Sequence, residues 1–145
     1  MARWTRSDGG STVTAGTVLA LSAAGALHVA WAAGSTFPFR SREALNDAVI
    51  GRQVTPGPAE CCAVAVLLGA ASVVVATAGR AHGRPSRAAA AGVALVLGAR
   101  AAFGFAGRTD VLVRGSESPR FRRLDRAVYS PICALLAAGA ANAAR

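Results

Sequence analysis

Two ionisable residues lie inside apolar stretches of this sequence, and they are the first candidates for chemistry. Arg100 interrupts the stretch 88–107, and His28 interrupts the stretch 13–33. An ionisable side chain within a membrane-spanning segment is rare and costly, so it is by default a candidate functional group. An arginine there could stabilise negative charge, and a histidine could act as a general acid or base.

Two further polar residues lie where another apolar stretch begins. Asp125 and Tyr129 are four positions apart, a spacing that puts both side chains on one face of a helix. With a rise of about 1.5 Å per residue, they lie in the same half of the membrane as Arg100 and His28. The sequence therefore predicts one polar cluster with an Arg100–Asp125 ion pair, in a cavity that opens towards the two longest loops.

Four apolar segments must position these side chains. They cover residues 13–33, 59–79, 88–107 and 127–144, and each is close to the roughly 20 residues that a helix needs to cross about 30 Å of hydrocarbon. Their continuous apolar character argues against the alternating strands of a membrane barrel. The chain is 53% hydrophobic, and its mean hydropathy is +0.41. We predict an all-α four-helix transmembrane bundle that forms a single domain over residues 1–145.

Small residues recur at every fourth position on the first and third segments. The two rows are Gly16, Ala20, Ala24 and His28, and Gly92, Val96, Arg100 and Gly104. Small residues let helix backbones approach closely in a membrane. We therefore expect both rows to face neighbouring helices.

The chain is strongly basic. Its net charge of +9 comes from sixteen arginines without a lysine, and most of them flank the apolar segments. Membrane lipids are therefore the expected partners, in place of nucleic acid. The loops 34–58 and 108–126 hold nine arginines and the opposite side holds six, a difference that favours the long loops facing the cytoplasm. Because these loops also hold most of the acidic residues, the orientation stays open.

Other kinds of chemistry lack a supporting pattern. Cys61, Cys62 and Cys133 form no Cys-x-x-Cys pair, and His28 and His82 are too far apart in the sequence to predict a metal site. The sequence holds no phosphate-binding glycine loop and no nucleophile elbow. We therefore expect no metal and no cofactor.

A cleaved signal peptide is the alternative interpretation of the first segment. Arg3 and Arg6 precede the apolar run, and Ala30-Trp31-Ala32 has the small-x-small form of a cleavage site. The run is about 21 residues, longer than the roughly 7–15 of a secretory apolar region. A retained membrane span is the preferred interpretation.

Three motifs extend along most of the chain. They are His28-Val-Ala-Trp31-Ala-Ala-Gly34 followed by Phe37-Pro38, then Arg100-Ala-Ala-Phe-Gly104-Phe105, and then Phe121-x-x-x-Asp125-x-x-x-Tyr129-Ser130-Pro131-x-Cys133. Over about residues 15 to 140, the chain resembles an uncharacterised family of small bacterial four-span membrane proteins, defined only as a domain of unknown function. Members often carry Gly-Asp-Phe after the arginine, whereas this chain has Gly104-Phe105 and no acid there. The resemblance implies a multi-pass fold in the bacterial cytoplasmic membrane and a set of candidate residues, without an activity.

Two classes of function fit these residues. The first is a cofactor-independent enzyme of the isomerase, cyclase or hydratase type that acts on an isoprenoid or other lipophilic substrate. Its predicted catalytic residues are His28, Arg100, Asp125 and Tyr129, and its predicted substrate-binding residues are Trp31, Phe37, Phe105 and Phe121. The second is a non-catalytic membrane binding, transport-accessory or resistance protein, which would have to form a homo-oligomer to enclose a transport path.

Overall fold

The computed structural model describes residues 7–52, 55–80, 83–112, 114–115 and 118–145. Over these residues the chain forms helices, turns and loops and contains no strand. The all-α prediction is therefore confirmed for the described part of the chain.

Three helices are long and apolar enough to cross a membrane. They are α1 (Ser7–Ala32), α3 (Pro58–Ala78) and α4 (Arg84–Phe105). Both α3 and α4 have a proline in their first turn, where a missing backbone N–H is tolerated because it has no partner within the helix. The first three predicted spans are confirmed as helices, and the chain is a multi-pass membrane protein.

The fourth predicted span, 127–144, falls on a helical run made of three elements. The helix α5 (Pro119–Leu124) passes directly into a π-helical turn (Asp125–Tyr129), and that turn passes into α6 (Ser130–Ala143). The π-helical turn divides the run, so no single α-helix covers the predicted span.

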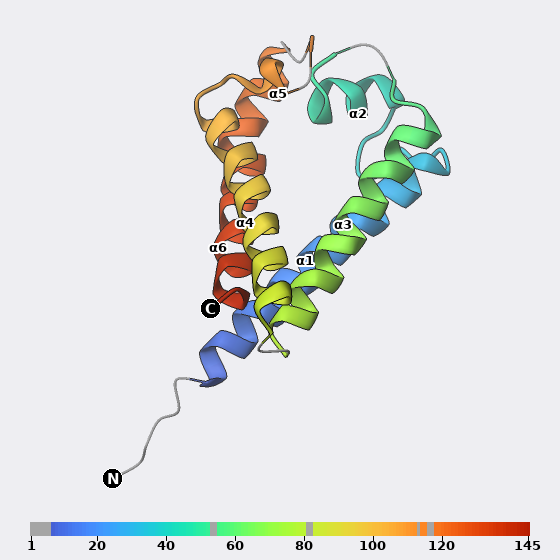
Figure 1. Cartoon of the computed structure of the whole chain (residues 1–145). Helices are drawn as coiled ribbons and strands as arrows, with labels where there is room; N and C mark the ends of the chain where they lie inside the picture. Colours follow the sequence, from blue (N-terminus) through green and yellow to red (C-terminus); the bar gives the residue numbers. More distant parts are fainter. Residues whose placement is uncertain (1–6, 53–54, 81–82, 113, 116–117) are drawn as a thin grey trace.

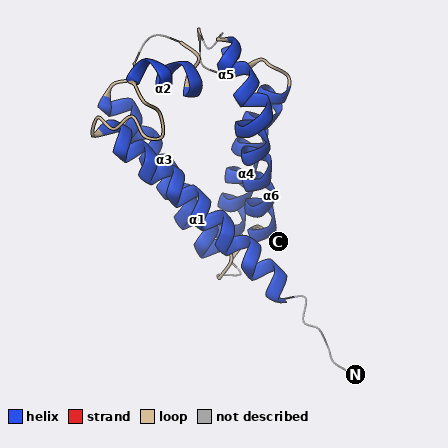
Figure 2. Cartoon of the chain, turned by 180° about the vertical axis from the view of Figure 1, so that it is seen from behind, coloured by secondary structure: helices blue, strands red, loops and turns tan. Residues whose placement is uncertain are grey.

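The long helices are arranged as two pairs. Figure 1 shows α1 beside α3 and α4 beside α6. The pairs meet near the end where α1 begins and α6 ends, and they diverge towards the other end, where α5 and the short helix α2 (Arg42–Val49) lie. The view from behind in Figure 2 shows the same arrangement. The helix pairs are therefore in close contact at one end only.

Hydroxyl-bearing and small residues hold the helices together. Within the first pair, the hydroxyl oxygens of Ser22 and Ser72 are 2.9 Å apart. Between the pairs, Gly139 of α6 lies so close to Thr17 of α1 that a side chain at this glycine would overlap the threonine hydroxyl. Such contacts are typical of membrane helices, because lipid supplies no hydrophobic force that drives helices together.

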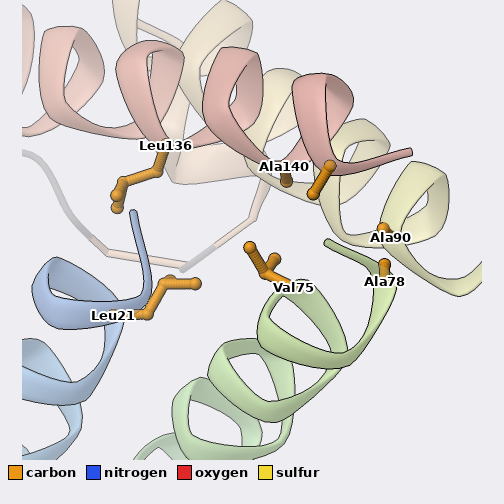
Figure 3. Close-up of a cluster of buried hydrophobic side chains, with 7 residues drawn as sticks. Leu21, Val75, Ala78, Ala90, Leu136 and Ala140 are labelled. Atoms are coloured by element: carbon orange, nitrogen blue, oxygen red, sulfur yellow. The ribbon is translucent and has the colours of Figure 1, made fainter. Parts of the chain in front are cut away.

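The apolar core lies where the two pairs meet. Seven buried side chains from α1, α3, α4 and α6 form it (Figure 3): Leu21, Val75, Ala78, Ala90, Leu136, Ala140 and Ala143. Much of the remaining apolar surface faces outwards, and Leu19, Leu95 and Leu135 are 70%, 74% and 73% exposed. An apolar surface of this kind suits contact with lipid.

The prediction that both rows of small residues face neighbouring helices is only partly correct. Their exposed members are Gly16, Ala20, Gly92 and Val96. The buried stripe of α1 runs one position later, through Thr17, Leu21 and Gly25. Because alanine and glycine occur on every side of these helices, their spacing does not identify the packed face.

Candidate functional site

Arg100 of α4 and Asp125 of the π-helical turn form an ion pair. Arg100 Nη2 donates to Asp125 Oδ1 over 2.6 Å, and the two side chains are 28% and 2% exposed. The predicted ion pair is therefore present. Removing one partner of a buried pair leaves an uncompensated charge and costs about 3–5 kcal/mol. The pair thus joins α4 to the π-helical turn.

Two hydroxyl groups complete the contacts of the Asp125 carboxylate. Thr109, in the 3-10 turn Thr109–Val111, donates to Oδ2, and Ser130 at the start of α6 donates to Oδ1 over 3.5 Å. Thr109 and Ser130 are both buried. Together with Arg100 and Asp125 they form a group that we call the polar lock. Both carboxylate oxygens of Asp125 are thus occupied by donors from within the protein.

The π-helical turn holds Asp125 in this position. The backbone N–H of Ser130 donates to the carbonyl of Asp125, one residue further back than in an α-helix. Pro131, the next residue, has no N–H and leaves the carbonyl of Ala127 without its α-helical donor. We attribute the wider turn to this proline. Single π-helical turns are uncommon and occur frequently at functional sites.

Gly104 allows α4 to approach the polar lock. A Cβ added at Gly104 would lie 2.8 Å from Arg100 Nη1 and 3.0 Å from Asp125 Oδ2, and it would overlap the hydroxyl oxygen of Ser130. The sequence pattern places Gly104 on a packed row, but it does not reveal Thr109 or Ser130 as partners of Asp125. The one signal in the sequence is that Ser130 belongs to the same motif as Asp125, five residues further along the chain.

One hydrogen-bond donor of the polar lock has no acceptor among the described residues. Nη1 of Arg100 is buried and has no hydrogen-bond partner among the described residues. A buried donor without a partner costs about 1–3 kcal/mol. This nitrogen is therefore a donor of the polar lock that the protein encloses and for which the described part of the chain supplies no partner.

Tyr129 and Phe121 connect the helical run to the loop helix α2. Tyr129 Oη donates to the carbonyl oxygen of Ala48 over 3.1 Å, and its ring centroid lies 6.3 Å from that of Phe121. Phe121 is 2% exposed and packs on Gly51, where φ is +74° and an added Cβ would lie 2.7 Å from the ring. These two predicted site residues fill the contact between α2 and α5, and the Phe121 ring has no free surface for a substrate.

His28 and Trp31 lie on α1, in the other helix pair. Their rings are T-shaped with centroids 4.8 Å apart, and His28 Nδ1 lies 2.8 Å from the carbonyl oxygen of Ala24. Trp31 Nε1 donates to the carbonyl oxygen of Phe37 over 2.7 Å. Among the described residues, neither makes a hydrogen bond or an ion pair with the polar lock. The residues predicted to form one cluster thus form two groups, because the helix pairs diverge at this end.

The two remaining predicted substrate-binding residues lie on the surface. Phe37 is 69% exposed and Phe105 is 50% exposed. Aromatic side chains at the ends of membrane helices commonly lie at the membrane–water interface. Exposure at these two positions is therefore consistent with contact to lipid as well as to a substrate.

Two cavities are lined by residues other than these. The larger, of about 800 Å³, lies at the end where α1 begins and α6 ends, opposite the polar lock. The other, of about 570 Å³, lies beside α5 and is lined by Pro119, Arg122, Arg123, Arg126 and Ala127. No predicted catalytic or substrate-binding residue lines either cavity.

Metal-ligating residues do not gather in the described part of the chain. No group of three or more histidine, cysteine, aspartate or glutamate side chains there could hold a metal ion. Cys61, Cys62 and Cys133 are free cysteines, and His82 lies outside the described residues.

Comparison with known families shows which family the chain belongs to. Residues 20–140 match the family described as a protein of unknown function (DUF3995), and the chain belongs to this family. The predicted kinship with a family of unknown function is thereby confirmed. No curated protein matches the chain, and no solved structure does.

Proposed function

We propose that this member of the DUF3995 family is a four-span protein of the bacterial cytoplasmic membrane that binds lipophilic molecules without transforming them. The fourth span is the helical run that contains the π-helical turn. The 14 residues of α6 rise about 21 Å, which is short of the roughly 30 Å of hydrocarbon. The five residues of the π-helical turn bring the run close to that length.

The observation that carries the non-catalytic proposal is the environment of Asp125. A general acid or base must come within hydrogen-bond reach of its substrate, directly or through one water. Asp125 is 2% exposed, and Arg100, Thr109 and Ser130 already donate to its two oxygens. A substrate would have to displace some of these donors. The arrangement instead suits a structural role, in which Asp125 joins three elements of the fold.

The positions of the cavities support a binding role. Both cavities are lined by arginines, and neither includes a residue of the polar lock. Arginine recognises phosphate and carboxylate groups through two parallel hydrogen bonds. Lipids with anionic heads are therefore the ligands that fit the charge of these surfaces.

A cofactor-independent enzyme is the second candidate, and two observations favour it. The π-helical turn lies at the polar lock, and Arg100 Nη1 is a buried donor without a partner among the described residues. If the lock opens locally, this nitrogen would stabilise negative charge on a lipophilic substrate while Asp125 transfers a proton.

One experiment separates the two candidates. A strain that lacks the gene is complemented with the native chain or with the double variant Arg100→Leu/Asp125→Leu, and extracted lipids are compared by mass spectrometry. A protein that binds lipids without transforming them predicts that no precursor accumulates in the deletion strain or in the strain with the double variant. An enzyme predicts that the double variant accumulates the same precursor as the deletion strain although the protein inserts normally, and that result would refute the non-catalytic proposal.

A further inference from the structure

We propose that the 800 Å³ cavity at the end where α1 begins and α6 ends binds the anionic, phosphate-bearing head of a membrane amphiphile. This cavity is called the terminal cavity below. The inference rests on the proposed function and names its ligand class and its binding site.

The terminal cavity is lined by basic side chains. Its lining includes Arg80 after α3, Arg87 of α4 and Arg145 after α6. Among the described residues that line it, there is no aspartate or glutamate. The three arginines come from three separate elements, so their charges converge only in the folded chain. A group of guanidinium side chains around one cavity favours an anionic ligand.

Hydrogen bonds to the backbone fix two of these arginines. Arg87 Nε donates to the carbonyl oxygen of Ala144 over 2.9 Å, and Arg80 Nη1 donates to the carbonyl oxygen of Ala76 over 3.0 Å. A guanidinium group carries five N–H donors, so each bond leaves several donors for a ligand. Less rotational freedom is lost on binding when a side chain is already held. Both guanidinium groups are exposed and keep N–H groups that can donate to phosphate oxygens.

One side of the terminal cavity is apolar. The α1 lining runs from Gly10 to Leu19, a rise of about 13 Å. It changes from serine, threonine and alanine at the helix start to Val18 and Leu19 at the deeper end. Leu19 is 70% exposed and therefore open to lipid. A molecule with its charged head at the arginines would place its hydrocarbon chain along Val18 and Leu19.

The size of the cavity argues for an amphiphile in place of free phosphate. Sites for small molecules commonly enclose roughly 300–1,000 Å³, and the terminal cavity of about 800 Å³ lies in the upper part of that range. Phosphate ion alone would leave the apolar part of the cavity empty. Phosphatidylglycerol has both the anionic head and the hydrocarbon chains that the lining requires.

Lipid binding to matched charge variants tests the inference. The full chain is purified in detergent, and its affinity for phosphatidylglycerol is measured by native mass spectrometry, with phosphatidylcholine and inorganic phosphate as separate ligands. The variant Arg80→Gln/Arg87→Gln should weaken phosphatidylglycerol binding by about tenfold or more, because charge-assisted hydrogen bonds are lost. The control Arg40→Gln/Arg108→Gln removes the same charge at exposed positions that line neither cavity, and it should change the affinity by less than about twofold.

Three results would overturn the inference. One is equal loss of affinity in both charge variants, which would indicate general attraction to a basic protein. Another is an unchanged affinity in Arg80→Gln/Arg87→Gln. The third is binding of inorganic phosphate as tight as that of phosphatidylglycerol, which would contradict an amphiphile as the ligand.

A second variant tests the site without removing an arginine. Ala15 lines the terminal cavity, whereas Ala20 is exposed on the same helix and does not line it. Ala15→Phe should therefore weaken phosphatidylglycerol binding, and Ala20→Phe should leave it unchanged. Equal binding by the two variants would contradict the inference. These residues lie far from the polar lock, so failure here is distinguishable from failure of the non-catalytic proposal, which the lipid profile of the Arg100→Leu/Asp125→Leu strain decides.

Discussion

Gly104 and Ser130 are in such close contact that a methyl group on the glycine would overlap the serine hydroxyl oxygen. The contact joins α4 to the start of α6 beside the Arg100–Asp125 ion pair. Gly104 is the penultimate residue of α4, and a glycine within a helix is normally unfavourable relative to alanine by up to about 1 kcal/mol. At this position the absence of a side chain is what allows the ion pair to form.

The first prediction concerns this contact. Gly104→Ala should lower the free energy of unfolding by about 1–3 kcal/mol, because the new methyl group forces Ser130 and Asp125 away from α4. Gly92→Ala is the matched control on the same helix, since a Cβ there meets nothing within 4 Å. Thermal melting in detergent checks both. A Gly104→Ala protein as stable as the Gly92→Ala protein would show that the contact is not close.

The second prediction concerns Thr109, which donates to Asp125 Oδ2. Thr109→Val keeps the shape of the side chain but removes the donor, and it should cost about 1–3 kcal/mol because a carboxylate oxygen loses its partner. The control is Thr77→Val, because the Thr77 hydroxyl is exposed and bonds only to carbonyl oxygens of its own helix. Melting temperatures that fall equally in both variants would contradict a special role of Thr109.

The third prediction concerns the separation of His28 from the polar lock. If the two groups are independent, the losses of stability in His28→Ala and Asp125→Asn should add in the double variant to within about 0.5 kcal/mol. A larger coupling would mean that the two helix pairs come together at this end and that one cluster exists after all.

The depth of each polar residue could be predicted from the sequence, but its direction around the helix could not. Rise per residue is fixed in a helix, so Arg100 and Asp125 are correctly placed at heights that allow an ion pair. His28 is predicted to lie in the same half of the membrane, yet it belongs to the helix pair that diverges from α4 and α6. The divergence depends on contacts such as Gly139 with Thr17, which are decided by packing and not by hydropathy.

The three long helices could be predicted because membrane thickness imposes a length on each apolar segment. The fourth predicted span is not one continuous α-helix like the other three. Pro131 lies inside it, and the helical run adopts a π-helical turn just before this residue. Hydropathy does not detect such a turn. The same turn sends Tyr129 to the carbonyl of Ala48 while Asp125 contacts Arg100, so the four-residue spacing did not give the two side chains common partners.

The fourth prediction concerns membrane topology. Reporter fusions at residues 83 and 145 should report the same compartment, and fusions at residues 50 and 115 should report the opposite one, because four spans return the chain to its starting side. Opposite signals at 83 and 145 would contradict a fourth span.

The central claim is that Asp125 is held by Arg100 as part of a structural lock. The most direct test is a double-mutant cycle of Arg100→Leu and Asp125→Leu, measured by unfolding of the purified protein in detergent. Each single variant leaves one buried charge uncompensated and should lose about 3–5 kcal/mol, whereas the double variant should recover at least half of the summed loss. Losses that simply add in the double variant would show that the two side chains do not stabilise each other, and they would contradict the lock.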